Sequence, residues 1–219
     1  PKISWIKQKY SDFKSLIFIL ILSCAINILI FSFFKSYNLL SNLIIISSLF
    51  LIIHSIKDLI INSKTKSYYN LPSFLSHTGF GILMLFIILN HNFSKEYDLN
   101  IKVGETKKID NIEIKFKDLK IEKRENYNVI IGNFNILDLK KNHQKNLNPE
   151  IRIYDNPQTL TFESAIKTNL KQDLYLTMSN IDGSDFYNVK FQIKPFMLWI
   201  WFAAFLTASG GLLRTFLKK

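Results

Sequence analysis

Four long apolar segments constrain the fold of this chain more than any other feature. They run over residues 15–34, 39–61, 74–89 and 195–217. A hydrocarbon core of about 30 Å needs about 20 helical residues, and the first, second and fourth segments reach that length. The third has 16 residues and needs its flanking residues to complete a span. We therefore predict four transmembrane helices.

The segment 91–194 between the third and fourth predicted helices is polar. It holds 17 Lys and Arg against 15 Asp and Glu, so it carries a net charge of +2 out of +11 for the whole chain. The remaining positive charge belongs to the ends of the apolar segments. This distribution argues against a nucleic-acid-binding domain, as does the absence of stacked aromatic residues beside a basic groove.

The basic residues beside the predicted helices are unevenly distributed. Only Lys35 lies in the turn between the first two helices. The other ten lie in or beside the N-terminus, the 62–73 loop and the C-terminus: Lys2, Lys7, Lys9, Lys14, Lys57, Lys64, Lys66, Arg214, Lys218 and Lys219. By the positive-inside rule these three regions are cytoplasmic. We expect three helices with a cytoplasmic N-terminus over 1–90, a periplasmic domain over 91–194, and a last helix with a cytoplasmic C-terminus over 195–219.

Within the polar segment the periodicity changes from helical to alternating. Short alternating runs predict strands, and they are Ile109–Phe116, Tyr127–Gly132, Glu150–Tyr154, Asp173–Met178 and Tyr187–Ile193. Asp182-Gly183 predicts a tight turn before the last of them. Six or seven short strands indicate a small sandwich or barrel. The predicted fold class is an α-helical membrane protein with an inserted all-β outer-face domain.

Several kinds of chemistry are excluded by the residues themselves. The single cysteine, Cys24, can form no internal disulfide and is expected to pack as a small apolar residue. His91 and His143 are far apart and lack metal-ligand spacing, and no hydrolase, metalloprotease or nucleotide-binding motif occurs. The alternating Lys and Glu of the polar segment is interpreted as a solvated strand face.

The third apolar segment opens with Ser76-His77-Thr78-Gly79-Phe80-Gly81. An ionisable side chain inside a membrane segment is costly and commonly marks a ligand, cofactor or ion path. The two glycines would let a flat cofactor or a neighbouring helix approach the backbone. The alternative is a helix-start histidine that is hydrogen-bonded to another helix. Ser73, after Pro72, is the expected N-cap of this helix.

Further blocks follow in a recognisable order. They are Pro149-Glu150-Ile151-Arg152-Ile153-Tyr154, Thr161-Phe162-Glu163-Ser164-Ala165-Ile166, Asp173-Leu174-Tyr175-Leu176, Lys194-Pro195-Phe196-Met197-Leu198-Trp199-Ile200-Trp201 and Gly210-Gly211-Leu212-Leu213. With the His77 helix, this series resembles the C-terminal third of CcmF, the haem-handling membrane subunit of System I cytochrome c maturation. The resemblance runs from about residue 74 to 217.

The resemblance implies a role in the bacterial inner membrane. Such proteins take haem from the chaperone CcmE and, with CcmH-type partners, assist its thioether attachment to apocytochrome c. They also hold a b-type haem between two transmembrane histidines, and His77 matches the second of these ligands, so it would bind the haem iron. In the family the first ligand and the tryptophan-rich haem-loading segment lie upstream, so this chain alone is not expected to attach haem. Phe162 and Ser164 depart from the family's usual Thr-Glu-Ala-Ala-Ile block, which leaves Glu163 in place.

His54 is the second histidine of the predicted helices. It lies about 10 Å into the bilayer from the cytoplasmic end of its helix, so it is an alternative opposing ligand; a hydrogen-bonded interhelical histidine is the other interpretation. Lys57 and Asp58, near the same end, are expected to snorkel toward the interface or to face the cytoplasm.

Two other function classes remain open at this point. A cofactor-free, membrane-anchored scaffold would show no haem absorbance. A transporter would need a broken helix, and Gly210-Gly211 is the one candidate for a break, although packing of small residues explains that pair more simply. Trp199 and Trp201 are interpreted as an aromatic belt at the outer end of the last helix.

Overall fold

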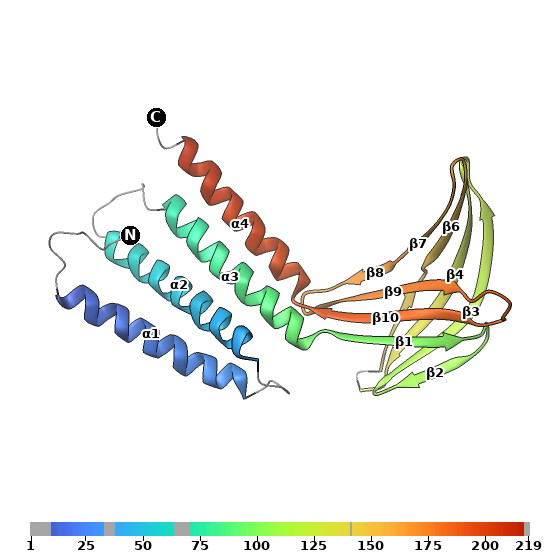
Figure 1. Cartoon of the computed structure of the whole chain (residues 1–219), viewed down its shortest axis with the longest axis horizontal. Coiled ribbons are helices and arrows are strands. Elements are labelled where there is room, and N and C mark those ends of the chain that lie inside the picture. The colour runs from blue at the N-terminus through green and yellow to red at the C-terminus, as the bar shows by residue number, and fades with distance from the viewer. Residues whose placement is uncertain (1–9, 33–37, 64–70, 141, 217–219) are drawn as a thin grey trace. The chain divides into compact units, whose positions relative to one another are not determined.

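The chain folds into two compact units, one helical and one of strands (Figure 1). The computed structural model describes residues 10–32, 38–63, 71–140 and 142–216, with no side-chain description for 10–12, 62 and 63. The strand unit covers Ser94–Pro195 and the helical unit the rest.

The helical unit consists of α1 (Tyr10–Phe31), α2 (Leu39–Ser63), α3 (Leu71–Phe93) and α4 (Met197–Phe216). Within the described residues, each of these four helices is long and apolar enough to cross a membrane. The prediction of four membrane-spanning helices is confirmed in this sense. The third helix gains its length from residues at both ends of the apolar segment.

The residues at the starts of α2 and α3 differ in how they relate to the predicted helix caps. The Asn38 side-chain oxygen accepts a hydrogen bond from the Leu40 backbone N–H at 3.0 Å, so Asn38 caps α2. Helix α3 already begins at Leu71, so Pro72 and Ser73 lie inside its first turn. The prediction that Ser73 is the N-cap was therefore wrong, because proline is tolerated in the first turn and the helix starts before it.

The helices pack in chain order, α1 on α2, α2 on α3 and α3 on α4. Small residues set the close approaches on either side of α3. A Cβ added to Gly79 would lie 2.7 Å from the Thr207 backbone nitrogen of α4, and one on Gly81 would lie 2.7 Å from Ile52 of α2. Gly210 of α4 is equally close to α3, since a Cβ there would lie 2.7 Å from the Pro72 carbonyl oxygen. The two glycines beside His77 therefore allow the neighbouring helices α4 and α2 to approach α3 closely.

Amide side chains tie α1, α2 and α3 together inside the apolar unit. The Asn27 amide donates to the Asn42 side-chain oxygen at 2.9 Å, and the Asn92 amide donates to Ser41 Oγ at 3.3 Å. Such hydrogen bonds join helices where apolar burial alone gives little preference. They fix the order of the first three helices.

The strand unit is a sandwich of two antiparallel sheets, and its strands are β1 (Lys95–Ile101), β2 (Thr106–Ile109), β3 (Ile112–Lys123), β4 (Tyr127–Asp138), β5 (His143–Leu147), β6 (Glu150–Asp155), β7 (Gln158–Glu163), β8 (Ala165–Thr168), β9 (Gln172–Asn180) and β10 (Tyr187–Pro195). One sheet has the order β1-β10-β9-β8. The other has the order β2-β3-β4-β6-β7, with β5 paired to the second half of β4. The prediction of a small sandwich is confirmed.

Aromatic and aliphatic side chains from both sheets form one core. Phe116 of β3 stacks on Phe134 of β4 with ring centroids 4.2 Å apart, and Leu176 and Phe191 of the other sheet are fully buried in the same cluster. The first and last strands pair with each other, Lys95 opposite Ile193. The unit therefore enters and leaves the chain at adjacent strands, as an insertion between two helices requires.

Four of the five alternating runs lie within single strands, and Gly183 of the predicted turn has φ 72. The run Ile109–Phe116, predicted as one strand, instead crosses the turn between β2 and β3, where Asp110 has φ 50. The described part of the chain nevertheless contains ten strands where six or seven were predicted. The additional strands include β5, with the sequence HQKNL, and the four-residue β8. Neither shows an apolar alternation, because both are short and lie at the edge of their sheet.

Candidate functional site

His77 lies on the exposed side of α3, away from the two helices that flank it. The side chains that share this side recur at helical spacing: Ser73, His77, Phe80, Met84 and Ile87. We call these five residues the open stripe. All are exposed apart from Met84, which is half-buried. Because Gly79 faces α4 and Gly81 faces α2, the open stripe is the third side of the helix.

The imidazole of His77 has one neighbour on its own helix. Its Nδ1 lies 3.4 Å from Ser73 Oγ, one turn earlier. In the tautomer in which Nδ1–H donates to this hydroxyl, Nε2 keeps its lone pair. This role of Ser73 was not predicted, although the i, i+4 spacing of Ser73 and His77 could have indicated it.

His54 has a different environment on α2. It is half-buried, its Nδ1 lies 3.7 Å from Asp58 Oδ2, and its ring stacks on Phe50 at 6.0 Å between centroids. Lys57, on the same helix, donates a hydrogen bond to Ser15 of α1. The contacts of Asp58 with His54 and of Lys57 with Ser15 were not predicted from the sequence.

The structure does not bring the imidazoles of His54 and His77 into contact in the part of the chain that it describes. Ile52 packs against Gly81, and consecutive helices run in opposite directions, so the two histidines lie at similar depth. Their side chains have different partners all the same. Among the described residues, no group of three or more His, Cys, Asp or Glu could hold a metal ion.

The remaining two histidines belong to other elements or other turns. His91 is exposed in the last turn of α3, and His143 is exposed at the start of β5 in the sandwich. Cys24 is a half-buried free thiol in α1. At the start of α4, Trp199 stacks on Phe86 of α3 at 6.0 Å and Trp201 is 68% exposed.

Two of the sequence blocks quoted above meet in the sandwich. Arg152 of β6 lies 2.8 Å from Glu150 and 3.8 Å from Glu163 of β7, and its guanidinium stands over the Tyr127 ring. The hydrogen bond that Arg152 donates to Glu150 raises the pKa of Arg152, because a nearby carboxylate favours the charged guanidinium. The retained Glu163 therefore belongs to an ion-pair cluster on the face of this sheet.

Comparison with known proteins relates this chain to CcmF-type proteins. Residues 92–195 match a family model described as the CcmF C-terminal β-sandwich. Over 147 residues the chain is 32% identical to the cytochrome c-type biogenesis protein CcmF of Haemophilus influenzae. The aligned region covers 66% of this chain and 22% of that protein. This chain matches the C-terminal portion of the CcmF family.

Other CcmF-type proteins give the same result. The CcmF of Escherichia coli K12 is 27% identical over 152 residues, covering 69% of this chain and 23% of that protein. A solved structure titled cytochrome c heme lyase CcmF has a TM-score of 0.70 with 13% identity, covering 97% of this chain and 36% of the other. That structure shows the shared fold of the helices and the sandwich. The chain spans about a fifth of the length of the curated CcmF relatives it matches.

Proposed function

We propose that this chain acts in cytochrome c biogenesis by holding a b-type haem in the membrane, with His77 as one axial ligand. The observation that carries the proposal is the position of His77 on the open stripe. An imidazole on an uncovered face of a membrane helix is costly unless a ligand or another chain covers it. The names of the CcmF relatives, which refer to cytochrome c biogenesis and a haem lyase, support haem as that ligand.

The residues of the open stripe fit one side of a haem. Ser73 holds the Nδ1 edge of His77, which orients the ring and leaves Nε2 available to the iron. Phe80 offers an exposed aromatic surface one turn along the helix. A haem bound there would supply one-electron redox chemistry, with its potential set in part by its axial ligands.

The opposing ligand is proposed to lie outside this chain, on an upstream helix of the family. His54 remains the alternative within the chain. Its carboxylate neighbour, Asp58, could fix the ring as a partner of that kind does for metal-bound histidine. The two printed contacts of the His54 ring, with Asp58 and Phe50, both lie within α2, which favours a role in the packing of that helix.

The proposed setting is the bacterial inner membrane, crossed several times, with the sandwich on the periplasmic side and both ends of the chain in the cytoplasm. The distribution of basic residues supports this orientation. Of the ten basic residues that define it, Lys14, Lys57 and Arg214 belong to described helices; Lys2, Lys7, Lys9, Lys64, Lys66, Lys218 and Lys219 lie outside the described residues, as does Lys35. Trp199 and Trp201 would then lie in an aromatic belt at the outer interface.

The proposed partners follow from this role. The haem chaperone CcmE would deliver haem, a CcmH-type subunit would assist, and apocytochrome c would receive it. The chain by itself is proposed to be inactive in haem attachment. The sandwich would position these partners.

The test is cytochrome c maturation in cells whose own gene carries His77→Ala. We expect covalently bound haem in cytochromes c, measured by haem staining of a denaturing gel, to fall at least tenfold. His91→Ala is the matched control, since His91 is an exposed histidine of the same helix. Immunoblots for the protein itself establish that both variants reach the membrane in equal amounts.

The alternative function, a cofactor-free scaffold anchored in the membrane, gives another outcome. If the sandwich alone carries the function, both variants mature cytochrome c like the parent. That result would contradict the proposed role of His77.

A further inference from the structure

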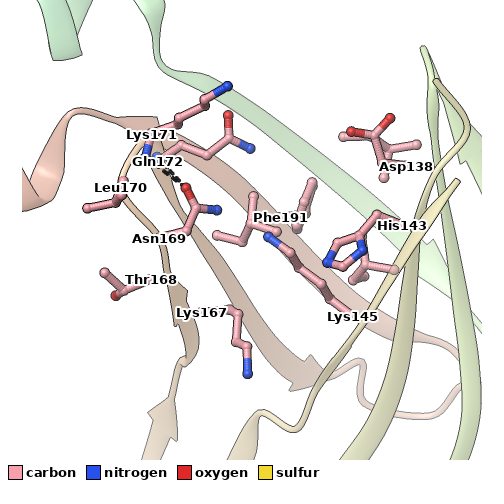
Figure 2. Close-up of a pocket in the computed structure, with 13 residues that line it drawn as sticks. Asp138, His143, Lys145, Lys167, Thr168, Asn169, Leu170, Lys171, Gln172 and Phe191 are labelled. Carbon is pink, nitrogen blue, oxygen red and sulfur yellow. Dashed lines mark hydrogen bonds between the residues drawn. The ribbon is translucent and has the colours of Figure 1, made fainter. Parts of the chain in front are cut away.

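The sandwich contains a cavity of about 550 Å³ beside strands β5 and β8, within the strand unit alone (Figure 2). Its apolar lining includes Ile136, Leu174 and Phe191, with exposed fractions of 3%, 5% and 0%. Pockets for small molecules are commonly about 300–1,000 Å³ and mostly apolar. This cavity has the size and the floor of such a pocket.

Three lysines line the same cavity. Lys145 comes from β5, Lys167 from β8 and Lys171 from the turn between β8 and β9. In Figure 2 the Lys145 side chain reaches across the cavity toward the side that holds Asn169. None of the three has an ion pair in the part of the chain that the structure describes.

The lining contains one carboxylate against these three ammonium groups. Asp138 ends β4, and its side-chain oxygen accepts a hydrogen bond from the Lys140 backbone N–H at 3.0 Å. The remaining excess of positive charge beside an apolar floor attracts anions, because low-dielectric walls strengthen the field in a cavity. His143 adds an exposed imidazole to the same lining.

The turn that carries Lys171 is held in place by its own hydrogen bonds. The Asn169 side-chain oxygen accepts from the backbone N–H groups of Lys171 and Gln172 at 2.8 and 2.9 Å, as the dashed lines of Figure 2 show. The Asn169 backbone N–H in turn donates to the Gln172 carbonyl at 3.2 Å. The position of the lysine backbone is therefore set before any ligand arrives, which lowers the entropic cost of binding.

We propose that this cavity binds an amphipathic carboxylate, with the apolar body on the floor and one or two carboxylates at the lysines. A small inorganic anion would leave the apolar floor uncovered, and an uncharged apolar molecule would leave the ammonium groups without partners. An amphipathic carboxylate satisfies both parts of the lining. A fatty acid and a porphyrin with propionate side chains belong to this class, and the inference does not depend on the proposed role of His77.

The test uses the full chain in nanodiscs of zwitterionic lipid and a photoreactive C16 fatty acid that carries a diazirine. Its methyl ester is the uncharged control probe. After irradiation, peptide mass spectrometry locates the label, which we expect on 136–145 and 167–174 with the acid and not with the ester. Competition with unlabelled palmitate or metal-free protoporphyrin then distinguishes a lipid source from a porphyrin source.

Variants test the role of the lysines. We expect K145Q/K167Q/K171Q to lower labelling of these peptides by roughly tenfold or more, because charge-assisted hydrogen bonds to a carboxylate are lost. The matched control, K108Q/K115Q/K120Q, removes three exposed lysines of β2 and β3 that do not line the cavity and should label like the parent.

Equal labelling of the cavity by acid and ester, labelling only elsewhere, or parental labelling of the first triple variant would each overturn the proposal. The comparison of acid with ester on the parent protein needs no variant. It therefore decides the question even if the triple variant fails to fold.

Discussion

At the scale of single residues, the surroundings of His54 and His77 distinguish two histidines that the sequence places in similar helices. His54 is bound within α2 by Asp58 and Phe50. His77 stands on the open stripe, with Ser73 as its hydrogen-bonding neighbour among the described residues. Hydropathy alone assigns both histidines the same free-energy cost of lying in a membrane segment. Only the packing of the helices distinguishes their environments.

Glu96 of β1 provides a residue whose effect depends on pH. Hydrogen bonds from Lys190, and then from Gln192 at 2.5 Å, lower the pKa of its carboxyl. A carboxyl with a lowered pKa stabilises the folded state above its unfolded pKa, and this contribution is lost as pH falls through the folded pKa. The contribution of Glu96 is therefore present at pH 7 and disappears below the ordinary value of 4.5.

We expect Glu96→Gln to lower the urea midpoint of the sandwich modestly at pH 7, with the difference from the parent shrinking below pH 4.5. The measurement is urea unfolding of the full chain followed by circular dichroism. Glu125→Gln is the control, since Glu125 is exposed and has no ion pair among the described residues. A difference that stays constant from pH 7 to pH 3 would mean that the Glu96 contact does not act through its charge.

At the scale of elements, the helices were more predictable than the strands. Twenty apolar residues in a row indicate a membrane helix whatever surrounds them, and all four predicted helices are present. The strands β5 and β8 were missed because neither shows an apolar alternation. The start of α2 depends on capping by Asn38, whereas α3 begins before the predicted cap Ser73.

Part of the candidate site could be predicted from the sequence. His77 could be singled out from its place in an apolar segment, and the glycines beside it were assigned to either a cofactor or a helix. The close contacts of Gly79 with α4 and of Gly81 with α2 show that the glycines allow neighbouring helices to approach. The lysine-lined cavity could not be predicted, because Lys145 and Lys167 lie in different sheets and come together only where the two sheets pack on each other.

The Gly210-Gly211 pair of α4 tests the helix packing directly. A Cβ on Gly210 would overlap Ser76 and Pro72 of α3, whereas one on Gly211 would meet nothing within 4 Å. Overpacking of this kind costs about 1–3 kcal/mol. Replacing an exposed helical glycine by alanine instead stabilises a helix by up to about 1 kcal/mol.

We therefore expect Gly210→Ala to lower the thermal unfolding temperature of the detergent-purified protein and Gly211→Ala to keep or raise it. Both variants make the same chemical change at adjacent positions, so each is a control for the other. Equal effects of the two substitutions would show that α3 and α4 do not approach at Gly210.

At the scale of the whole molecule, the chain consists of a helical unit with a sandwich inserted between α3 and α4. The sandwich has its own core, and its first strand, β1, is paired along its full length with the last strand, β10. Because the sandwich has a core of its own, its stability depends on contacts within the strand unit.

We predict that the excised segment 94–195 folds without the helices. A domain of this size is typically stable by about 5–15 kcal/mol, and we expect the lower end because the sandwich carries no disulfide. The measurement is far-UV circular dichroism with urea titration of the purified segment. A strand spectrum with one cooperative transition is the expected result, and a disordered spectrum in buffer would show that the helices are needed to fold it.

The most direct test of the central claim is a reduced-minus-oxidised visible spectrum of the protein purified from its native membrane, with the parent compared to His77→Ala, His54→Ala and His91→Ala. We predict a b-type spectrum in the parent that is lost in His77→Ala and kept in His91→Ala. Loss in His54→Ala as well would make His54 the opposing ligand. A b-type spectrum of parental intensity in His77→Ala, or no haem in the parent, would contradict the account.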